Sequence, residues 1–234
     1  MVRRIAAEAL GTAMLLAAVV GSGIMGERLS GGNVAIALLA NTIATGAALV
    51  ALILTFASVS GAHFNPVVTL VEAIHGRMSW VDTRAFIGAQ IVGAFIGVAM
   101  AHVMFGEALF SPSLHVRNGG AQLVSEFVAT FGLIGVILGT SRATPAAVPF
   151  AVGAYITAAY WFTASTSFAN PAVTLARAAT NTFAGIRPVD VPGFIIAQVI
   201  GGVAASFVFG WLLSESLKSR DVVELDGVRR QRRA

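Results

Sequence analysis

Long apolar runs separated by short polar stretches dominate the chain. Six of them, each about 20 residues or longer with few or no charges, cover 5–26, 34–59, 85–105, 121–140, 146–168 and 191–213. Because an α-helix rises about 1.5 Å per residue, a run of this length spans roughly 30 Å, the hydrocarbon thickness of a bilayer. The pattern predicts an all-α polytopic membrane protein with six transmembrane helices.

The composition agrees with a membrane class. Hydrophobic residues make up 56% of the 234 residues and charged residues only 11%, whereas a soluble domain carries about 25% charged residues. Cysteine is absent, which excludes disulfides and thiolate metal sites. No histidine has a partner at metal-ligand spacing, so we expect no metal site and no cofactor.

The basic residues follow the loops in a way that predicts topology. Eleven of the 15 Lys and Arg residues fall at the N-terminus, in the 75–84 and 141–145 turns, and in the C-terminal tail. The positive-inside rule then places both termini in the cytoplasm of a bacterial-type inner (plasma) membrane. The basic tail, 219–234, is expected to act as a solvated topology anchor rather than to bind anionic lipid, and nucleic-acid binding is not expected. The eleven are Arg3, Arg4, Arg77, Arg84, Arg142, Lys218, Arg220, Arg229, Arg230, Arg232 and Arg233.

The chain repeats itself in three places. "AEALGTAMLL" at 7–16 is echoed at 125–134, and "GAQIVGAFIG" at 88–97 is echoed at 196–205. An Asn-Pro pair recurs between these landmarks, 105 residues apart. The repeats, about 1–108 and 119–218, hold three spans each, so the second enters the bilayer from the opposite face. We therefore predict one transmembrane channel domain, 1–218, built from inverted repeats.

Each Asn-Pro pair predicts the start of a half-length helix. Asn is a favoured N-cap and Pro a favoured first helical residue. The apolar run after Asn65-Pro66 lasts to about Ile74, and the run after Asn170-Pro171 lasts to about 179. Each is about 15 Å long, half a bilayer, and is tolerated at that depth only if it is buried in protein or lines a water-filled cavity.

Inverted symmetry would bring the two helix N-termini together near the mid-plane of the membrane. Their partial positive charges oppose a cation or proton, while the Asn amides can donate to a neutral solute. The predicted function is a pore for uncharged molecules, with water and small neutral solutes as its partners. A coupled secondary transporter is the alternative, in which Glu8 and Glu126 would bind a proton or Na⁺. An enzyme is not expected, since no nucleophile is accompanied by a base.

At these motifs the chain resembles the aquaporin, or major intrinsic protein, family over roughly residues 3–213. The resemblance rests on "SGAHFNPVVTL", "FANPAV", the early Glu in each half and the repeated "AQ". It implies six spans, two re-entrant half-helices, a homotetramer, and loops supported by Glu8 and Glu126. The pore motifs are then Asn65-Pro66-Val67 and Asn170-Pro171-Ala172, and His63 lines a vestibule. The first motif has Val67 where the family pattern has Ala.

The resemblance also implies a selectivity filter. Its members would be Thr45, Ser167, Val173 and, on the fifth span, Tyr160, with Thr157 and Trp161 as alternatives. Water-selective members have Arg at the position of Val173, so a neutral and more permissive filter is expected. Arg177, one helical turn further along, is expected to be structural rather than to swing toward the vestibule.

Neighbouring stretches resemble the bacterial aquaglyceroporins encoded beside arsenic-resistance genes. They are "GSGIMGERLSGGN", "LLANTIATGAAL" and "YITAAYWFTASTSFANPAVTLARA". This resemblance implies passage of glycerol-like polyols, of arsenite as As(OH)₃ and of water. A water-selective aquaporin remains the alternative within the channel class.

Overall fold

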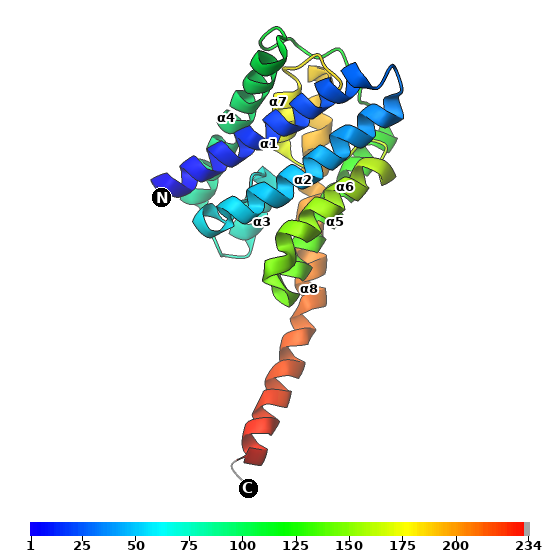
Figure 1. The fold of residues 1–234 in the computed structure, drawn as a ribbon. Coiled ribbons are helices and arrows are strands. Elements are labelled where there is room, and N and C mark those ends of the chain that lie inside the picture. Colours follow the sequence, from blue (N-terminus) through cyan, green and yellow to red (C-terminus); the bar gives the residue numbers. More distant parts are fainter. Residues whose placement is uncertain (232–234) are drawn as a thin grey trace.

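The computed structural model describes the backbone of residues 1–231 and the side chains of residues 1–214. Every regular element in this part of the chain is helical, and the predicted all-α fold is confirmed (Figure 1). The side chains of the basic tail 219–234 lie outside the described residues. In chain order the elements are α1 (Val2–Leu29), α2 (Val34–Ser60), α3 (Pro66–Ile74), α4 (Trp80–Phe105), α5 (Gly120–Ala143), the 3₁₀ turn η1 (Pro145–Ala147), α6 (Val148–Phe162), α7 (Pro171–Arg177), the 3₁₀ turn η2 (Pro188–Asp190) and α8 (Val191–Gln231).

Local signals in the sequence set several helix ends. The side chains of Asn33 and Ser79 accept backbone N–H groups in the first turns of α2 and α4. Both helices end at a glycine with a left-handed backbone, Gly61 at φ 95° and Gly106 at φ 68°. Residues with a Cβ are disfavoured in that conformation, so glycine terminates these helices at low cost.

The fifth long helix is shorter than the apolar run that predicted it. Helix α6 has 15 residues and ends at Phe162, whereas the run continues to 168. In the remainder and directly after it, Thr166, Ser167 and Ala169 have φ values of 61°, 49° and 47°, which a right-handed helix does not allow. Hydropathy did not mark this boundary, because the loop is short and contains no charged residue.

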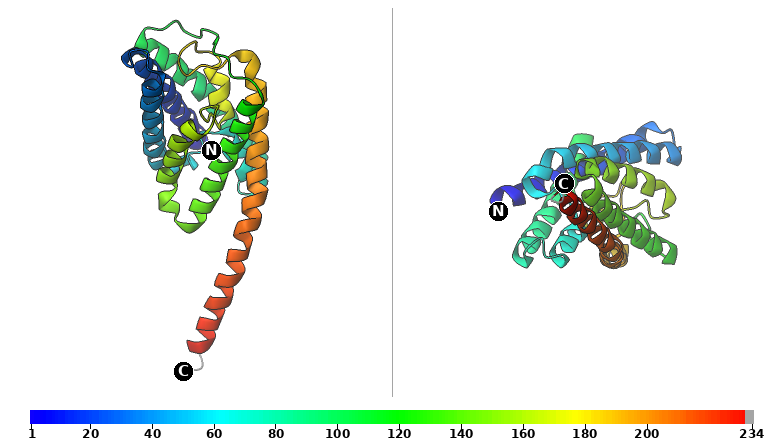
Figure 2. Two further views of the ribbon diagram at one scale, coloured as in Figure 1. Left: turned by 90° about the vertical axis from the view of Figure 1, so that its right-hand side faces the viewer. Right: turned by 90° about the horizontal axis from the view of Figure 1, so that it is seen from below.

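The two halves of the chain pack in the same way. Helix α1 packs on α4 and α5 packs on α8, and α2 against α6 joins the halves (Figures 1 and 2). A Cβ added to Gly93 of α4 would overlap the carbonyl oxygen of Ala9 in α1. One added to Gly201 of α8 would overlap that of Phe127 in α5. Glycine at these equivalent positions therefore lets each helix pair approach closely.

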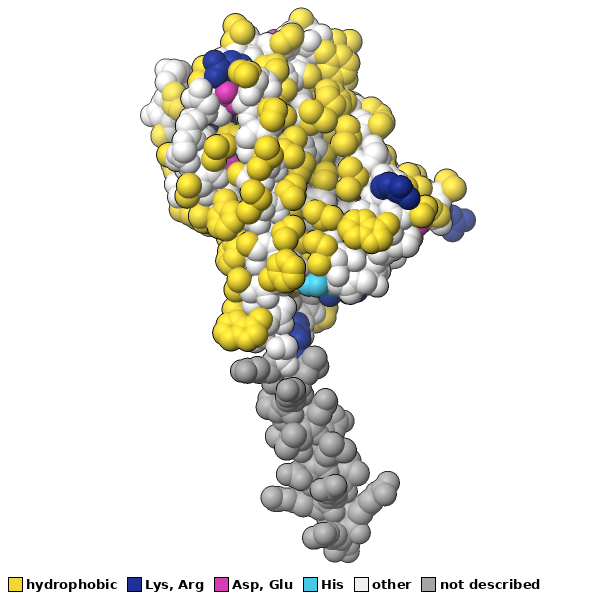
Figure 3. Space-filling model, turned by 180° about the vertical axis from the view of Figure 1, so that it is seen from behind, with side chains coloured by type: hydrophobic (Ala, Val, Ile, Leu, Met, Phe, Trp, Pro, Cys, Tyr) yellow, Lys and Arg dark blue, Asp and Glu magenta, His cyan; other side chains and the backbone are white. Residues whose placement is uncertain are grey.

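The outer surface is suited to lipid. In the part of the chain that the structure describes, five helical segments are long and apolar enough to cross a bilayer: α1, α2, α4, α5 and Pro188–Ser214. Helix α6, with 15 residues, is shorter than a full span. Large apolar side chains project outward, among them Leu54, Val92 and Ile196, each more than half exposed. Figure 3 shows apolar side chains over most of one face, with Lys and Arg toward its edges. This is a multi-pass membrane protein.

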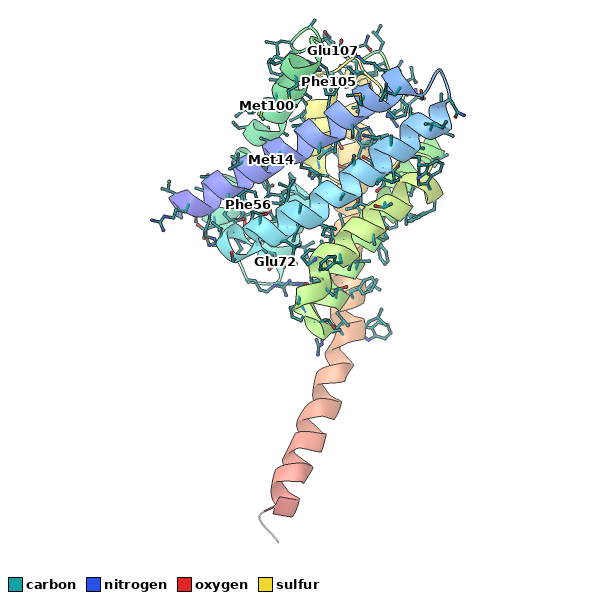
Figure 4. All side chains as sticks on the ribbon, viewed as in Figure 1. Met14, Phe56, Glu72, Met100, Phe105 and Glu107 are labelled. Atoms are coloured by element: carbon teal, nitrogen blue, oxygen red, sulfur yellow. The ribbon has the colours of Figure 1, made fainter. Side chains whose placement is uncertain are left out.

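Helices α1 and α4 run in the same direction, which places their ends together. The guanidinium carbon of Arg4 lies 5.1 Å from the centre of the Phe86 ring, where both helices begin. At the other end, that of Arg28 lies 5.4 Å from the Phe105 ring and its Nη2 is 2.7 Å from Glu107 Oε1. Figure 4 marks Phe105 and Glu107 at this end of the bundle and Glu72 near the opposite end.

The described loops that were predicted to share one side lie at one end of the structure, and the side chains of the tail 219–234 are outside the described residues. His75 Nε2 lies 2.9 Å from Ser206 Oγ, which ties the turn after α3 to α8. Arg77 of that turn lines the same hollow as Arg142 at the end of α5 and Leu213 of α8. The start of α1, these turns and this part of α8 therefore lie at one end of the bundle.

Candidate functional site

Two short helices begin at the centre of the molecule, each capped by its own asparagine. Asn65 Oδ1 accepts the backbone N–H of Val67 at 2.9 Å, and α3 starts at Pro66. Asn170 Oδ1 accepts the N–H groups of the second and third residues of α7, at 3.0 and 3.3 Å. Helix α3 ends at Ile74, where its apolar run ends, and α7 ends at Arg177, two residues before the predicted end.

The two caps are bonded to each other's loops. Asn65 Nδ2 donates to the carbonyl oxygen of Ala169 at 2.7 Å, and Asn170 Nδ2 donates to that of Phe64 at 2.7 Å. A primary amide has two N–H donors, so each asparagine keeps one for other partners. The sequence-predicted juxtaposition of Asn65 and Asn170 is what the structure shows.

The residues just before each asparagine have an unusual backbone. Phe64 and Ala169 both have φ 47°, and two residues earlier Ala62 and Ser167 have φ 51° and 49°. Such left-handed conformations cost of order 1 kcal/mol or more for non-glycine residues and persist only where the surroundings impose them. The matching pattern at an offset of 105 residues shows that the repeat extends to backbone conformation.

Two buried glutamates hold these loops. Glu8 accepts the backbone N–H groups of His63 at 3.0 Å and Phe64 at 2.7 Å. Glu126 accepts those of Phe168 and Ala169, both at 2.9 Å. Neither glutamate is exposed to solvent. Their carboxylate oxygens are occupied by loop donors, which favours the supporting role proposed from the sequence over ion binding.

A glutamine completes each of these networks. Gln90 Nε2 donates to Glu8 Oε2 at 2.8 Å, and Gln198 Nε2 donates to Glu126 Oε2 at 2.6 Å. The same amides reach the hydroxyls of Thr69 on α3 and Thr174 on α7. In the sequence the two glutamines mark the repeat, and no separate role is predicted for them. Their recurrence 108 residues apart was the signal that could have identified them as part of the site.

A cavity of about 300 Å³ runs along the two caps and is lined by both halves of the chain. Thr45, Tyr160, Ser167 and Val173 line it, each 5% exposed or less. The hydroxyl of Tyr160 donates to Thr45 Oγ1 at 3.3 Å. Ser167 Oγ is buried without a hydrogen-bond partner among the described residues. The cavity therefore offers hydroxyl groups and an apolar isopropyl group at its predicted filter.

The alternatives for the fifth-span position lie elsewhere. Trp161 is 49% exposed on the outer surface of the bundle. Thr157 Oγ1 donates to the carbonyl oxygen of Gly153 in its own helix at 2.8 Å, and neither side chain lines the cavity. Tyr160 is the one of the three that does.

His63 and Val67 differ in their relation to the cavity. His63 lines it and places Nδ1 3.0 Å from Thr69 Oγ1. Val67 is buried away from it, in an apolar cluster with Val71 and Ile134, and its neighbour Val68 lines the cavity instead. Val67 therefore belongs to the packing of α3 and not to the lining.

Arg177 lines the cavity as well, although its side chain is only 2% exposed. Its Nε donates to the carbonyl oxygen of Ala184, and its guanidinium carbon lies 3.3 Å from the centre of the Phe168 ring. It is thus both fixed by a loop and adjacent to the cavity. The sequence favours a structural role for Arg177 over one at the vestibule, and the structure shows a fixed side chain that also lines the cavity.

A second arginine lies on the same aromatic ring. Arg117 Cζ is 5.0 Å from the centre of Phe168, and its Nε donates to the carbonyl oxygen of Gly185 at 2.8 Å. Its Nη1 donates to the carbonyl oxygen of Ser165 at 3.1 Å. Burial lowers the pKa of Arg117 to about 10, so the group remains cationic at neutral pH. No sequence signal singled out this residue.

Comparison with known proteins places the chain in a family. The family model described as "Major intrinsic protein" matches residues 1–148. The chain is 57% identical to "Aquaglyceroporin AqpS" of Rhizobium meliloti, over 90% of each chain. It is 28% identical to "Aquaporin NIP1-1" of Zea mays, over 95% of this chain and 79% of that protein.

A solved structure has the same fold. The aquaglyceroporin from Plasmodium falciparum superposes with a TM-score of 0.73 at 19% identity, covering 93% of this chain and 98% of that one. At this identity the likeness concerns the fold alone. The family match over more than half of the sequence and the 57% identity to the relative from Rhizobium meliloti show that the chain belongs to the major intrinsic protein family.

Proposed function

We propose that this protein is a passive channel for small uncharged solutes that excludes ions and protons. The solutes are glycerol-like polyols, arsenite as As(OH)₃ and water. The observation that carries the proposal is the cavity shared by the two capped half-helices, whose filter positions Thr45, Tyr160, Ser167 and Val173 are all uncharged. Membership of the family and the printed name of the relative from Rhizobium meliloti support it.

The two asparagines would bind the solute at the middle of the path. Each has one amide N–H committed to the opposite loop and a second available to a solute oxygen. The helices behind them begin at the asparagines, so both partial positive ends point toward this place. A neutral molecule can replace its hydrogen bonds to water by hydrogen bonds from these amide donors. A cation is repelled by the partial positive charges of the two helix ends.

The filter would set the size of the solute. Val173 occupies the first turn of α7 at the position where the water-selective pattern has Arg. An isopropyl group has neither the length nor the five N–H donors of a guanidinium, so the passage is wider and less polar there. Hydroxyl groups of Thr45 and Ser167 can bind the oxygens of a polyol or of As(OH)₃.

Stopped-flow permeabilities of proteoliposomes for water, glycerol, urea and As(OH)₃ test this proposal. We expect Val173→Arg to lower glycerol and As(OH)₃ permeability by about tenfold or more, which needs only about 1.4 kcal/mol of added barrier, and to lower water permeability less. Val116→Arg, an exposed loop position, is the control for adding an arginine and should change none of them. Equal loss of all four permeabilities would show that Val173 does not set the filter.

A coupled transporter would give a different result in the same vesicles. Uphill accumulation of a solute driven by a pH or Na⁺ gradient would contradict a passive channel. If only water passed the parent protein, the water-selective alternative would hold. We further propose that the protein is a homotetramer with both termini in the cytoplasm, in line with its family and with its charge distribution.

A further inference from the structure

The cavity carries a fixed cation that lies outside the predicted filter. Among the described residues that line it, Arg177 is the one Arg or Lys. It is four residues beyond Val173 on α7, which places both side chains on the same face of the helix and Arg177 about 6 Å further from the central asparagines. A charge in a water-poor passage acts more strongly than one in bulk water.

Arg177 is held rigidly where it lines the cavity. Its Nε is bonded to the carbonyl oxygen of Ala184, and its guanidinium stacks on Phe168. Phe168 also lines the cavity, and its backbone N–H is bound by Glu126. No Nη hydrogen bond from Arg177 to another described residue is found, so up to four of its five N–H donors remain for a solute.

Arg117 supports this arrangement without lining the cavity. It contacts the same Phe168 ring, and its N–H donors bind the carbonyl oxygens of Gly185 and Ser165. The two arginines thus use consecutive carbonyl groups, of Ala184 and Gly185, as acceptors. A Cβ at Gly185 would overlap Ser113 Oγ and the carbonyl oxygen of Thr180, so only glycine fits this close turn.

We propose that Arg177 is a specificity-determining residue of the pore, a cation displaced one helical turn from Val173. This role rests on the channel function proposed above. Val173 then selects solutes by size, and Arg177 selects them by charge. The guanidinium repels cations and donates to the oxygens of an incoming neutral solute before the solute reaches the uncharged filter. Cations are therefore excluded at Arg177, even though Val173 makes the filter wider.

The test compares cation leak with solute permeability in proteoliposomes of the full chain. We expect Arg177→Gln to raise K⁺ leak, followed with an ion-sensitive dye, by about tenfold or more, with glycerol permeability changed by less than about threefold. Arg177→Lys keeps the charge and should stay cation-tight. Arg28→Gln, which removes an exposed charge from an ion pair at the same end of the bundle, should leave both readouts unchanged.

Rescue separates a charge role from a structural one. In the double variant Arg177→Gln/Val173→Arg, a cation is restored one turn away, and K⁺ leak should return to the parent level even though the loop bond to Ala184 stays lost. An unchanged leak in Arg177→Gln would overturn the inference, and so would a leak in the Lys or double variant as large as that in Arg177→Gln. A parent protein that conducts no glycerol would instead contradict the proposed function.

Discussion

At the scale of single residues, the first pore motif differs from the second by one side chain. A glycine on the neighbouring helix makes room for the larger side chain. Val67 stands where the second motif has Ala172. A Cβ added to Gly202 of α8 would overlap Val67 Cγ1, so the larger side chain on α3 is accommodated by a glycine on α8. The position equivalent to Gly202 in the first repeat, 108 residues earlier, is Ala94. One contact between a half-helix and a long helix therefore pairs a valine with a glycine, where the equivalent positions hold two alanines, Ala172 and Ala94.

This complementarity predicts a coupled pair of substitutions. Gly202→Ala should destabilise the protein by about 1–3 kcal/mol, because a buried β-branched neighbour cannot move aside, and Val67→Ala in the same chain should restore most of the loss. Midpoints of thermal unfolding in detergent measure both. Gly210→Ala on the same helix, where an added Cβ has nothing within 4 Å, is the control. A double variant no more stable than Gly202→Ala alone would contradict the packing argument.

At the scale of elements, each half-helix depends on the carboxylate that binds the loop before it. Glu126 accepts two backbone N–H groups and the amide of Gln198. In Glu126→Gln one acceptor oxygen becomes an NH₂ group that faces donors. We expect a loss of about 1–3 kcal/mol in stability and a lower water permeability, since the loop also positions Asn170.

The equivalent substitution in the other half gives an internal comparison. Glu8 accepts four hydrogen bonds, from Ser60, His63, Phe64 and Gln90, so Glu8→Gln should be at least as damaging. Glu27→Gln, on the exposed end of α1, is the control. If both buried variants kept full stability and permeability, the glutamates would not hold the loops. Proton-coupled solute uptake lost in either variant would favour the transporter alternative.

The elements also show which features were open to prediction. Apolar length and the Asn-Pro caps are local signals, so α3 and α7 could be placed from sequence within two residues. The end of α6 could not, because the backbone of 163–169 is imposed by Glu126 and by the Arg117 bond to Ser165. These contacts join residues more than 40 positions apart, and no local pattern encodes them. The contact of Arg117 with the Phe168 ring was unpredictable for the same reason.

At the scale of the whole molecule, charge and fold divide the bundle into two unlike ends. The start of α1, the turn at 75–79 and the end of α5 lie together, and five of the nine basic residues with described side chains belong to this end. The opposite end has the Arg28–Glu107 pair and the loops that hold Arg117 and Arg187. The positive-inside rule then predicts that the more basic end lies in the cytoplasm.

Single-cysteine labelling tests this orientation cleanly, because the chain has no cysteine of its own. Asn118→Cys and Ser141→Cys introduce thiols at exposed positions of opposite ends. On intact bacterial cells whose periplasm is accessible, a membrane-impermeant maleimide should label Asn118→Cys and not Ser141→Cys, while permeabilised cells should show both. The reverse pattern would put the termini outside. In that orientation the Arg177 end of α7 would face the cytoplasm, so solutes leaving the cell would reach Arg177 before Val173. The same measurement therefore decides from which side of the membrane a solute first meets Arg177.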